Sequence, residues 1–223
     1  MFEQEIELEK RQSAAIPLLL IVGLIVGLIG VAAYFFVESR KVLTPSEAAN
    51  VVAAILRAQG PTTVGFHTGL IKERFDESPL DVRYRLLEKA GIIKVGRTKG
   101  TKAPVTLTAK GNELVKQIPG VKQSKDADGN ESYVIPLATR KVVEISGITM
   151  SGPERATIQY SWRWDPNALG ESFDASGPLL ATFAAYDRVS LIDKYGARFY
   201  HGAATKVAVT VVKGPQRWLL AGE

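Results

Sequence analysis

The chain contains no cysteine among its 223 residues, so disulfides, thiolate metal sites and cysteine nucleophiles are excluded. Only two histidines occur, His67 and His201, and neither has metal-ligating residues at a coherent spacing. A Gly-x-Ser-x-Gly motif, an HExxH motif and a P-loop are also missing. Nucleophilic and metal-assisted catalysis therefore have no support in the sequence. We expect no catalytic residue, no metal site and no cofactor.

Charged side chains are missing from residues 13–37, which read SAAIPLLLIVGLIVGLIGVAAYFFV. At a rise of about 1.5 Å per residue, this run is roughly 37 Å long as a helix and exceeds a hydrocarbon layer of about 30 Å. The run predicts one transmembrane helix over residues 14–37, preceded by an acidic tail at residues 1–13. A cleaved signal peptide is the alternative, but its apolar region would be shorter and its leading segment basic.

Gly23 and Gly27 form a GxxxG motif in this helix, and Gly30 follows one turn later. Small residues at this spacing let two membrane helices approach closely. We therefore expect this face to pack against another helix, either in a homodimer or in a partner protein.

The orientation of the helix is almost balanced under the positive-inside rule. Lys10 and Arg11 precede the helix, whereas Arg40, Lys41 and Arg57 follow it. Short N-terminal tails before a single anchor commonly remain in the cytoplasm. This consideration favours a soluble region on the extracytoplasmic, periplasmic side, and an inactive C-terminal alkaline phosphatase fusion would contradict that placement.

The first soluble segment, residues 42–120, is predicted to mix helices and short strands. Thr44-Pro45-Ser46-Glu47 predicts a capped helix that ends at Gly60-Pro61. Residues 61–77 are expected to be irregular, with a short strand near residues 64–67. A second helix is predicted from Ser78 to Gly91, followed by strands at 92–95 and 105–107 and a helix at 109–118.

Residues 86–118, LLEKAGIIKVGRTKGTKAPVTLTAKGNELVKQI, resemble the second half of a winged-helix domain. In that family a helix ends in an L-x-x-A-G turn, a β-hairpin wing with a basic tip follows, and L-T-x-x-G leads into the next helix. The residues that carry the resemblance are Leu87, Ala90, Gly91, Leu107, Thr108 and Gly111. The resemblance implies a winged-helix-like module whose helix and wing contact DNA.

The second soluble segment is predicted to be an antiparallel α+β domain at residues 132–223, joined by a polar linker at 121–131. Apolar residues alternate with polar ones from 156 to 164, and residues 141–148 are expected to form the neighbouring strand. A hairpin is predicted at 207–221. Residues 179–185 are predicted to be a further strand and residues 188–195 a short helix. The expected fold class is therefore α+β.

Basic residues are concentrated between Val82 and Lys110, where eight lysines and arginines face one acidic residue, Glu88. Such a cluster predicts an anionic ligand or partner: DNA if this region is cytoplasmic, lipid headgroups or an acidic protein otherwise. A solvated basic face without a ligand is the alternative. The candidate binding residues are Arg83, Arg85 and Lys89 on the predicted helix, and Arg97, Lys99 and Lys102 on the predicted wing.

Together these features favour a membrane-anchored, non-enzymatic binding or assembly protein whose soluble domains dock onto protein partners at the bilayer. One alternative is a membrane-tethered winged-helix transcription regulator. Another is an enzyme of unfamiliar type, which would need a deep polar pocket with convergent carboxylates or His201.

Overall fold

The computed structural model describes residues 19–34, 42–72, 78–98 and 100–222. It confirms an α+β fold in which all strand pairs are antiparallel. A helix covers residues 19–34, and the later helices are α2 (Pro45–Ala58), α3 (Val82–Lys89), α4 (Ala109–Gln117), α5 (Gly170–Phe173), α6 (Pro178–Ala181) and α7 (Ala185–Lys194). The strands are β1 (Thr62–Lys72), β2 (Ile93–Val95), β3 (Lys102–Leu107), β4 (Lys122–Lys125), β5 (Glu131–Gly152), β6 (Arg155–Pro166), β7 (Thr205–Lys213) and β8 (Trp218–Leu220).

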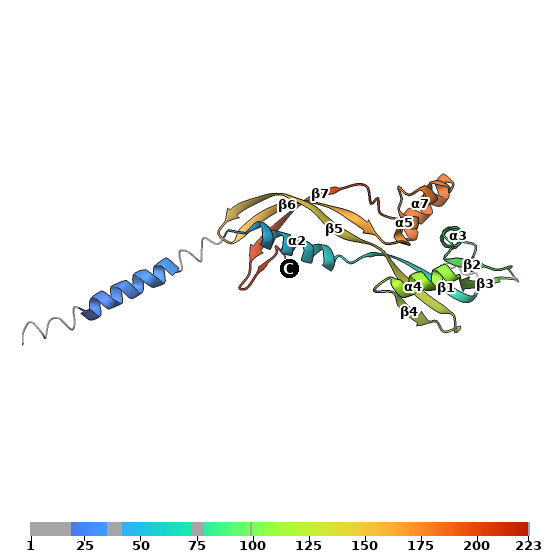
Figure 1. The fold of residues 1–223 in the computed structure, drawn as a ribbon, viewed down its shortest axis with the longest axis horizontal. Helices are drawn as coiled ribbons and strands as arrows, with labels where there is room; N and C mark the ends of the chain where they lie inside the picture. Colours follow the sequence, from blue (N-terminus) through green and yellow to red (C-terminus); the bar gives the residue numbers. More distant parts are fainter. Residues whose placement is uncertain (1–18, 35–41, 73–77, 99, 223) are drawn as a thin grey trace, which may run out of the picture.

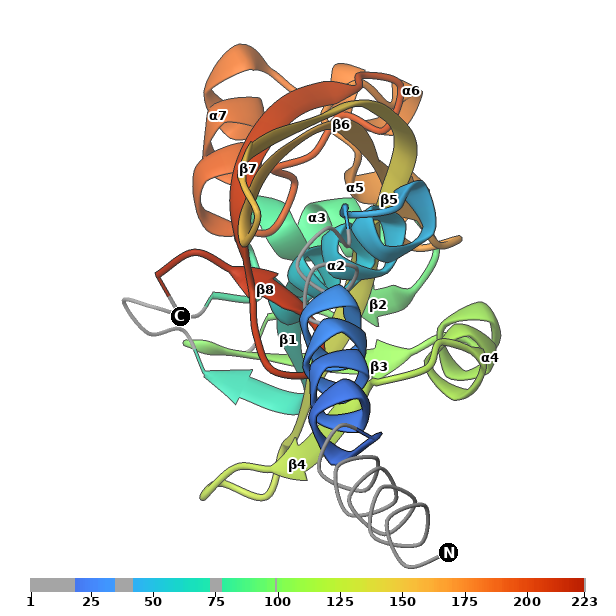
Figure 2. The ribbon, with the colours of Figure 1, turned by 90° about the vertical axis from the view of Figure 1, so that its left-hand side faces the viewer.

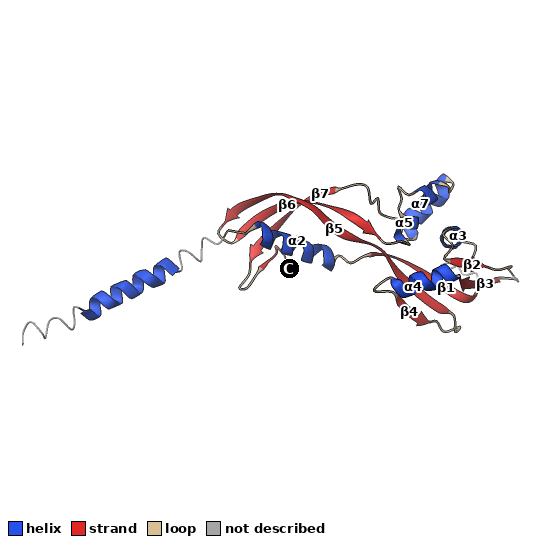
Figure 3. Ribbon diagram, in the orientation of Figure 1, coloured by secondary structure: helices blue, strands red, loops and turns tan. Residues whose placement is uncertain are grey.

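One sheet contains all eight strands in the order β2-β3-β1-β5-β6-β7-β8, with β4 paired to β5 (Figures 1 and 3). The long strands β5 and β6 connect an end of the molecule that holds α2 and β8 to an end that holds α3, α4 and α7 (Figure 1). The adjacent strands at 141–148 and 156–164 and the hairpin at 207–221 are confirmed.

Helix α2 begins at the predicted capping box. The side chain of Thr44 accepts a hydrogen bond from the Glu47 backbone nitrogen at 3.2 Å, and the Glu47 carboxylate accepts one from the Thr44 backbone nitrogen at 2.9 Å. These bonds satisfy two of the donors that a helix start leaves open. The face with Ala48, Val52 and Leu56 is buried.

We call the first of two apolar clusters the α2 core, because α2 packs in it against the strands that arch over the helix (Figure 2). Its strand residues include Ile158 and Tyr160 of β6 and Trp218 of β8. The alternation of apolar residues in β6 directs one face of this strand towards α2. The helix and the curved sheet thus bury each other.

The second cluster, which we call the α3 core, lies at the opposite end of the sheet. It combines Leu86 and Leu87 of α3 with Ile135 of β5, Phe173 of α5 and Phe199 in the loop before β7. Side chains from both predicted soluble domains therefore share one core. The predicted linker at 121–131 contains β4, which pairs with β5. The independent folding of two domains stays a prediction.

Residues 62–72 form a continuous strand, so the prediction of an irregular segment with only a short strand is wrong for this range. Strand β1 pairs with β5 over residues 62–68 and with β3 over residues 69–72. Gly69 lies at the change of partner with φ of 112°, where a Cβ would be 2.4 Å from Asn130 Oδ1. Glycine is unfavourable inside a strand, which weakens the sequence pattern of β1. The same glycine allows β1 to change its neighbouring strand from β5 to β3.

The predicted strand at 179–185 is also wrong, because residues 178–181 form α6. Pro178 stands at the start of the helix, where its fixed φ is favourable. Leu180 and Phe183 are both buried and lie three residues apart in the sequence. This spacing is typical of one face of a helix and not of a strand. The predicted helix at 188–195 is confirmed as α7, which begins three residues earlier.

Arg140 of β5 lies between the two cores. Its Nη1 donates a hydrogen bond to the Gly60 carbonyl oxygen at 3.0 Å, and its guanidinium lies 4.3 Å from the Trp164 ring centroid. Trp164 in turn lies 5.8 Å from the ring of Phe199 in the α3 core. These contacts connect the segment after α2 to the opposite end of the sheet.

Candidate functional site

The predicted anionic-ligand residues on α3 are engaged within the protein. Arg83 is only 8% exposed, and its Nη1 donates a hydrogen bond to the Gly65 carbonyl oxygen of β1 at 2.7 Å. Its guanidinium also lies 5.1 Å from the Tyr84 ring and 4.8 Å from the Tyr195 ring. Arg83 thus joins α3, the edge of β1 and the end of α7.

Arg85 and Lys89 extend from α3 towards α6 and α7. Arg85 Nη2 lies 2.8 Å from Asp187 Oδ1, and Lys89 Nζ donates a hydrogen bond to Thr182 Oγ1 at 3.3 Å. Lys89 Nζ also lies 4.4 Å above the Phe183 ring. Three of the six predicted basic site residues therefore contact the C-terminal helices. The contacted residues lie about 100 positions downstream, and no local pattern predicts them.

The predicted site residues on the β2–β3 hairpin are not part of the contact between α3 and the C-terminal helices. Arg97 and Lys102 are exposed on and beside the β2–β3 hairpin, and Lys99 lies outside the described residues. On α3, Arg83 is buried, whereas Arg85 and Lys89 stay exposed while they contact Asp187 and Thr182. The structure therefore separates α3 residues that contact other parts of the chain from exposed residues on the hairpin.

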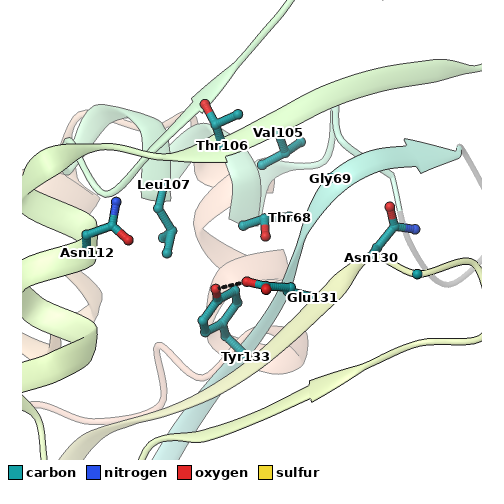
Figure 4. A pocket seen from close by; sticks show the side chains of 10 residues that line it. Thr68, Gly69, Val105, Thr106, Leu107, Asn112, Asn130, Glu131 and Tyr133 are labelled. Carbon is teal, nitrogen blue, oxygen red and sulfur yellow. Dashed lines mark hydrogen bonds between the residues drawn. The ribbon is translucent and has the colours of Figure 1, made fainter.

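A cavity of about 350 Å³ lies where β1 leaves β5 for β3 (Figure 4). The Glu131 carboxylate accepts hydrogen bonds from the Tyr133 hydroxyl and from Gln123 Nε2, the latter at 3.2 Å. Burial and the neighbouring Glu131 carboxylate raise the pKa of Tyr133 from its ordinary value of 10.0 to about 12, so its phenol stays protonated well into the alkaline range. The lining residues are Thr68, Gly69, Val105, Thr106, Leu107, Asn112, Gly129, Asn130, Glu131 and Tyr133.

His201 lies in a second polar cluster, on the loop between α7 and β7. The buried Asp174 carboxylate accepts hydrogen bonds from the His201 backbone nitrogen at 2.7 Å, from His201 Nδ1 and from Ser176. Glu171 Oε2 is 3.9 Å from the same ring nitrogen. Sequence reasoning missed Asp174, which is 27 residues away and matches no motif. Among the described residues, no group of three or more histidine or acidic side chains could hold a metal ion.

The Asp174 carboxylate should stabilise the fold in a pH-dependent way. Burial raises the pKa of Asp174, but hydrogen bonds from Ser176 and His201 outweigh burial and lower the pKa below its ordinary value of 3.8. Because the folded-state pKa is lowered, this stabilisation is present above pH 3.8 and is lost as the pH falls through the folded-state value.

We expect Asp174→Asn to lower the unfolding free energy at neutral pH by about 2 kcal/mol, and to make stability less sensitive to pH below 4. Urea unfolding of the full chain in mild detergent, followed by tryptophan fluorescence between pH 3 and 7, measures both effects. The exposed Asp193→Asn is the matched control. Equal pH dependence in wild type and Asp174→Asn would contradict the expectation.

Among the described residues, no helix has both the length and the apolar character needed to cross a bilayer. The predicted transmembrane segment 14–37 is only partly described: residues 14–18 and 35–37, like the tail 1–13, lie outside the described residues. The helix at 19–34 carries the three predicted packing glycines. A Cβ placed on Gly23, Gly27 or Gly30 would meet nothing within 4 Å, so no described part of the chain covers this face.

Comparison of the chain with protein-family models, curated proteins and solved structures finds no match.

Proposed function

We propose that this chain is a single-pass, membrane-anchored, non-enzymatic binding or assembly protein, with residues 14–37 as the anchor. The observation that carries the proposal is the apolar surface of the helix at 19–34. Leu19, Leu24 and Leu28 are 70%, 65% and 61% exposed. A continuous exposed surface of this kind is rare in monomeric soluble proteins and is stable when lipid or another protein covers it.

The length of the chain supports an arrangement with α2 near the bilayer. Eight peptide steps separate residue 34 from residue 42, and they reach at most roughly 28 Å. The segment therefore keeps the start of α2 near the end of the proposed anchor. The α3 core lies at the far end of β5 and β6, where it can meet partners away from the membrane (Figure 1).

The outer face of α7 is the partner surface that we favour at that far end. Tyr186 is 83% exposed and Val189, one turn later, is 55% exposed. Exposed aromatic residues often anchor protein interfaces, because they bury a large area and lose little side-chain entropy.

A photo-crosslinking amino acid at Tyr186 tests the proposed docking role. We expect one discrete crosslinked species in the membrane fraction of cells that express the full chain. The same amino acid at Lys206, an exposed residue of β7, is the control. Identical crosslinking patterns from the two positions, or none from either, would contradict a partner surface on α7.

The rival proposal, a membrane-tethered DNA-binding regulator, is supported chiefly by exposed basic residues of the hairpin, among them Arg97 and Lys102. Arg85 and Lys89 of α3 are exposed, but DNA would have to compete there with their contacts to Asp187 and Thr182. Binding to DNA through phosphate contacts would weaken steeply with added salt.

A further inference from the structure

A groove of about 520 Å³ lies between the outer side of α2 and the hairpin formed by β7 and β8. The α2 residues that line it are Glu47, Asn50, Val51, Ala54, Ile55, Arg57 and Ala58. The hairpin residues that line it are Gln216, Arg217, Trp218, Leu219 and Leu220. Its volume is in the range of small-molecule binding sites, about 300–1,000 Å³.

The groove faces solvent, and apolar residues form part of its lining on both sides. Val51 and Ile55 are half-buried beside the face of α2 that packs in the α2 core, and Leu219 and Leu220 are half-buried opposite them. Trp218 is 6% exposed and belongs to both the groove and the α2 core. Because Trp218 is fixed by packing in the α2 core, an acyl chain in this groove would contact a rigid side chain.

The charged residues of the groove favour an anion. Arg57 and Arg217 are exposed, and the Arg57 Nε donates a hydrogen bond to the Ala53 carbonyl oxygen at 3.2 Å, which holds its side chain along α2. The Glu47 carboxylate is engaged in the capping box with Thr44. Two guanidinium groups next to an apolar groove complement a phosphate attached to an acyl chain.

We infer that this groove binds one acyl chain of an anionic membrane phospholipid, with Arg57 and Arg217 contacting the headgroup. The inference rests on the proposed membrane anchor, because the 28 Å reach between residues 34 and 42, roughly estimated from extended-chain geometry, keeps α2 close to the bilayer. Lipid binding here would fix the orientation of the elongated soluble region relative to the membrane.

Trp218 provides a direct test. The full chain is reconstituted in phosphatidylcholine vesicles that contain either brominated phosphatidylglycerol or brominated phosphatidylcholine at equal mole fraction. Bromine quenches tryptophan fluorescence at short range, and a Trp218→Phe variant identifies the part of the signal that comes from Trp218. We expect stronger quenching of Trp218 by the brominated anionic lipid than by the neutral one.

Three variants sharpen the test. Arg57→Gln with Arg217→Gln should reduce the preference for the anionic lipid by about 25-fold, since each basic residue near an anionic lipid surface contributes roughly a fivefold change. Ala54→Phe fills the groove from an exposed helix position and should reduce quenching by both lipids. Arg163→Gln removes an exposed arginine of β6 outside the groove and should change nothing.

Equal quenching by the two brominated lipids in the wild-type chain would overturn the inference. Quenching by a brominated free fatty acid but not by the brominated phospholipid would also overturn it, because the bilayer would then not be the source. Flotation of the chain with the vesicles is measured in the same samples. A chain that fails to float refutes the anchor, whereas a chain that floats without lipid-selective quenching refutes only the groove.

Discussion

Replacing both Val26 and Ile29 with arginine is expected to move the full chain from the membrane fraction to the aqueous fraction. Both side chains are 63% exposed on the helix at 19–34. One arginine at the centre of a transmembrane helix costs about 3 kcal/mol on insertion scales, which is roughly a 100-fold change in the insertion equilibrium. Two arginines should therefore change it by about 10⁴-fold. Carbonate extraction of membranes and vesicle flotation measure the result.

The matched control is the double change of Val26 and Ile29 to leucine, which keeps the segment apolar and should leave it in the membrane. If the double arginine variant still floats with vesicles, the helix is not held by lipid. The anchor would equally be refuted if the wild-type chain purified without detergent as a monodisperse monomer, since its apolar surface would then be covered by protein.

Gly111→Ala is expected to destabilise the chain more than Asp174→Asn does. A Cβ at Gly111 would lie 2.0 Å from the Ile92 carbonyl oxygen. That oxygen accepts a hydrogen bond from the Thr108 backbone nitrogen at 3.0 Å and lies 3.1 Å from Thr108 Oγ1, so it cannot move without disrupting the start of α4. Alanine favours a helix over glycine by about 1 kcal/mol, but the backbone clash is larger.

We expect a net destabilisation of about 3 kcal/mol, which corresponds to a fall in melting temperature of roughly 6–12 °C for a domain of this size. Thermal unfolding of the full chain in mild detergent, followed by circular dichroism, measures it. Gly147→Ala in β5 is the control, because its nearest neighbour would be Gln159 Oε1 at an ordinary contact distance of 3.5 Å. A Gly111→Ala protein as stable as Gly147→Ala would show that α4 does not need this close approach.

The positions that suggested a winged-helix resemblance include three residues that meet at this junction. Thr108 Oγ1 donates to the Gly91 carbonyl oxygen at 2.6 Å and accepts from the Gly111 backbone nitrogen at 2.9 Å. Gly91 has a positive φ of 74°, which permits the turn at the end of α3. Local conformation and close packing thus account for these three residues without reference to a ligand.

The contacts of the basic candidate residues were harder to predict from the sequence than the helix and strands on which these residues lie. The sequence places Arg85 and Lys89 on a helix, and they do lie on α3. Their neighbours Asp187 and Thr182 are brought there by α6 and α7, and this packing has no signature within either segment. Charge density along the chain could not distinguish basic side chains without partners in the protein from basic side chains that pair with distant residues of the same chain.

The sequence alone determined the structural features that depend on residues close together along the chain. The capping box at Thr44, the alternating strand at 156–164 and the turn at Gly91 are all local, because hydrogen bonding and burial there depend on positions a few residues apart. The partner change of β1 at Gly69 and the carboxylate pairing of His201 with Asp174 depend on tertiary structure. Such contacts join segments tens of residues apart, and their free energy arises only when strands and helices pack together, so no local pattern encodes them.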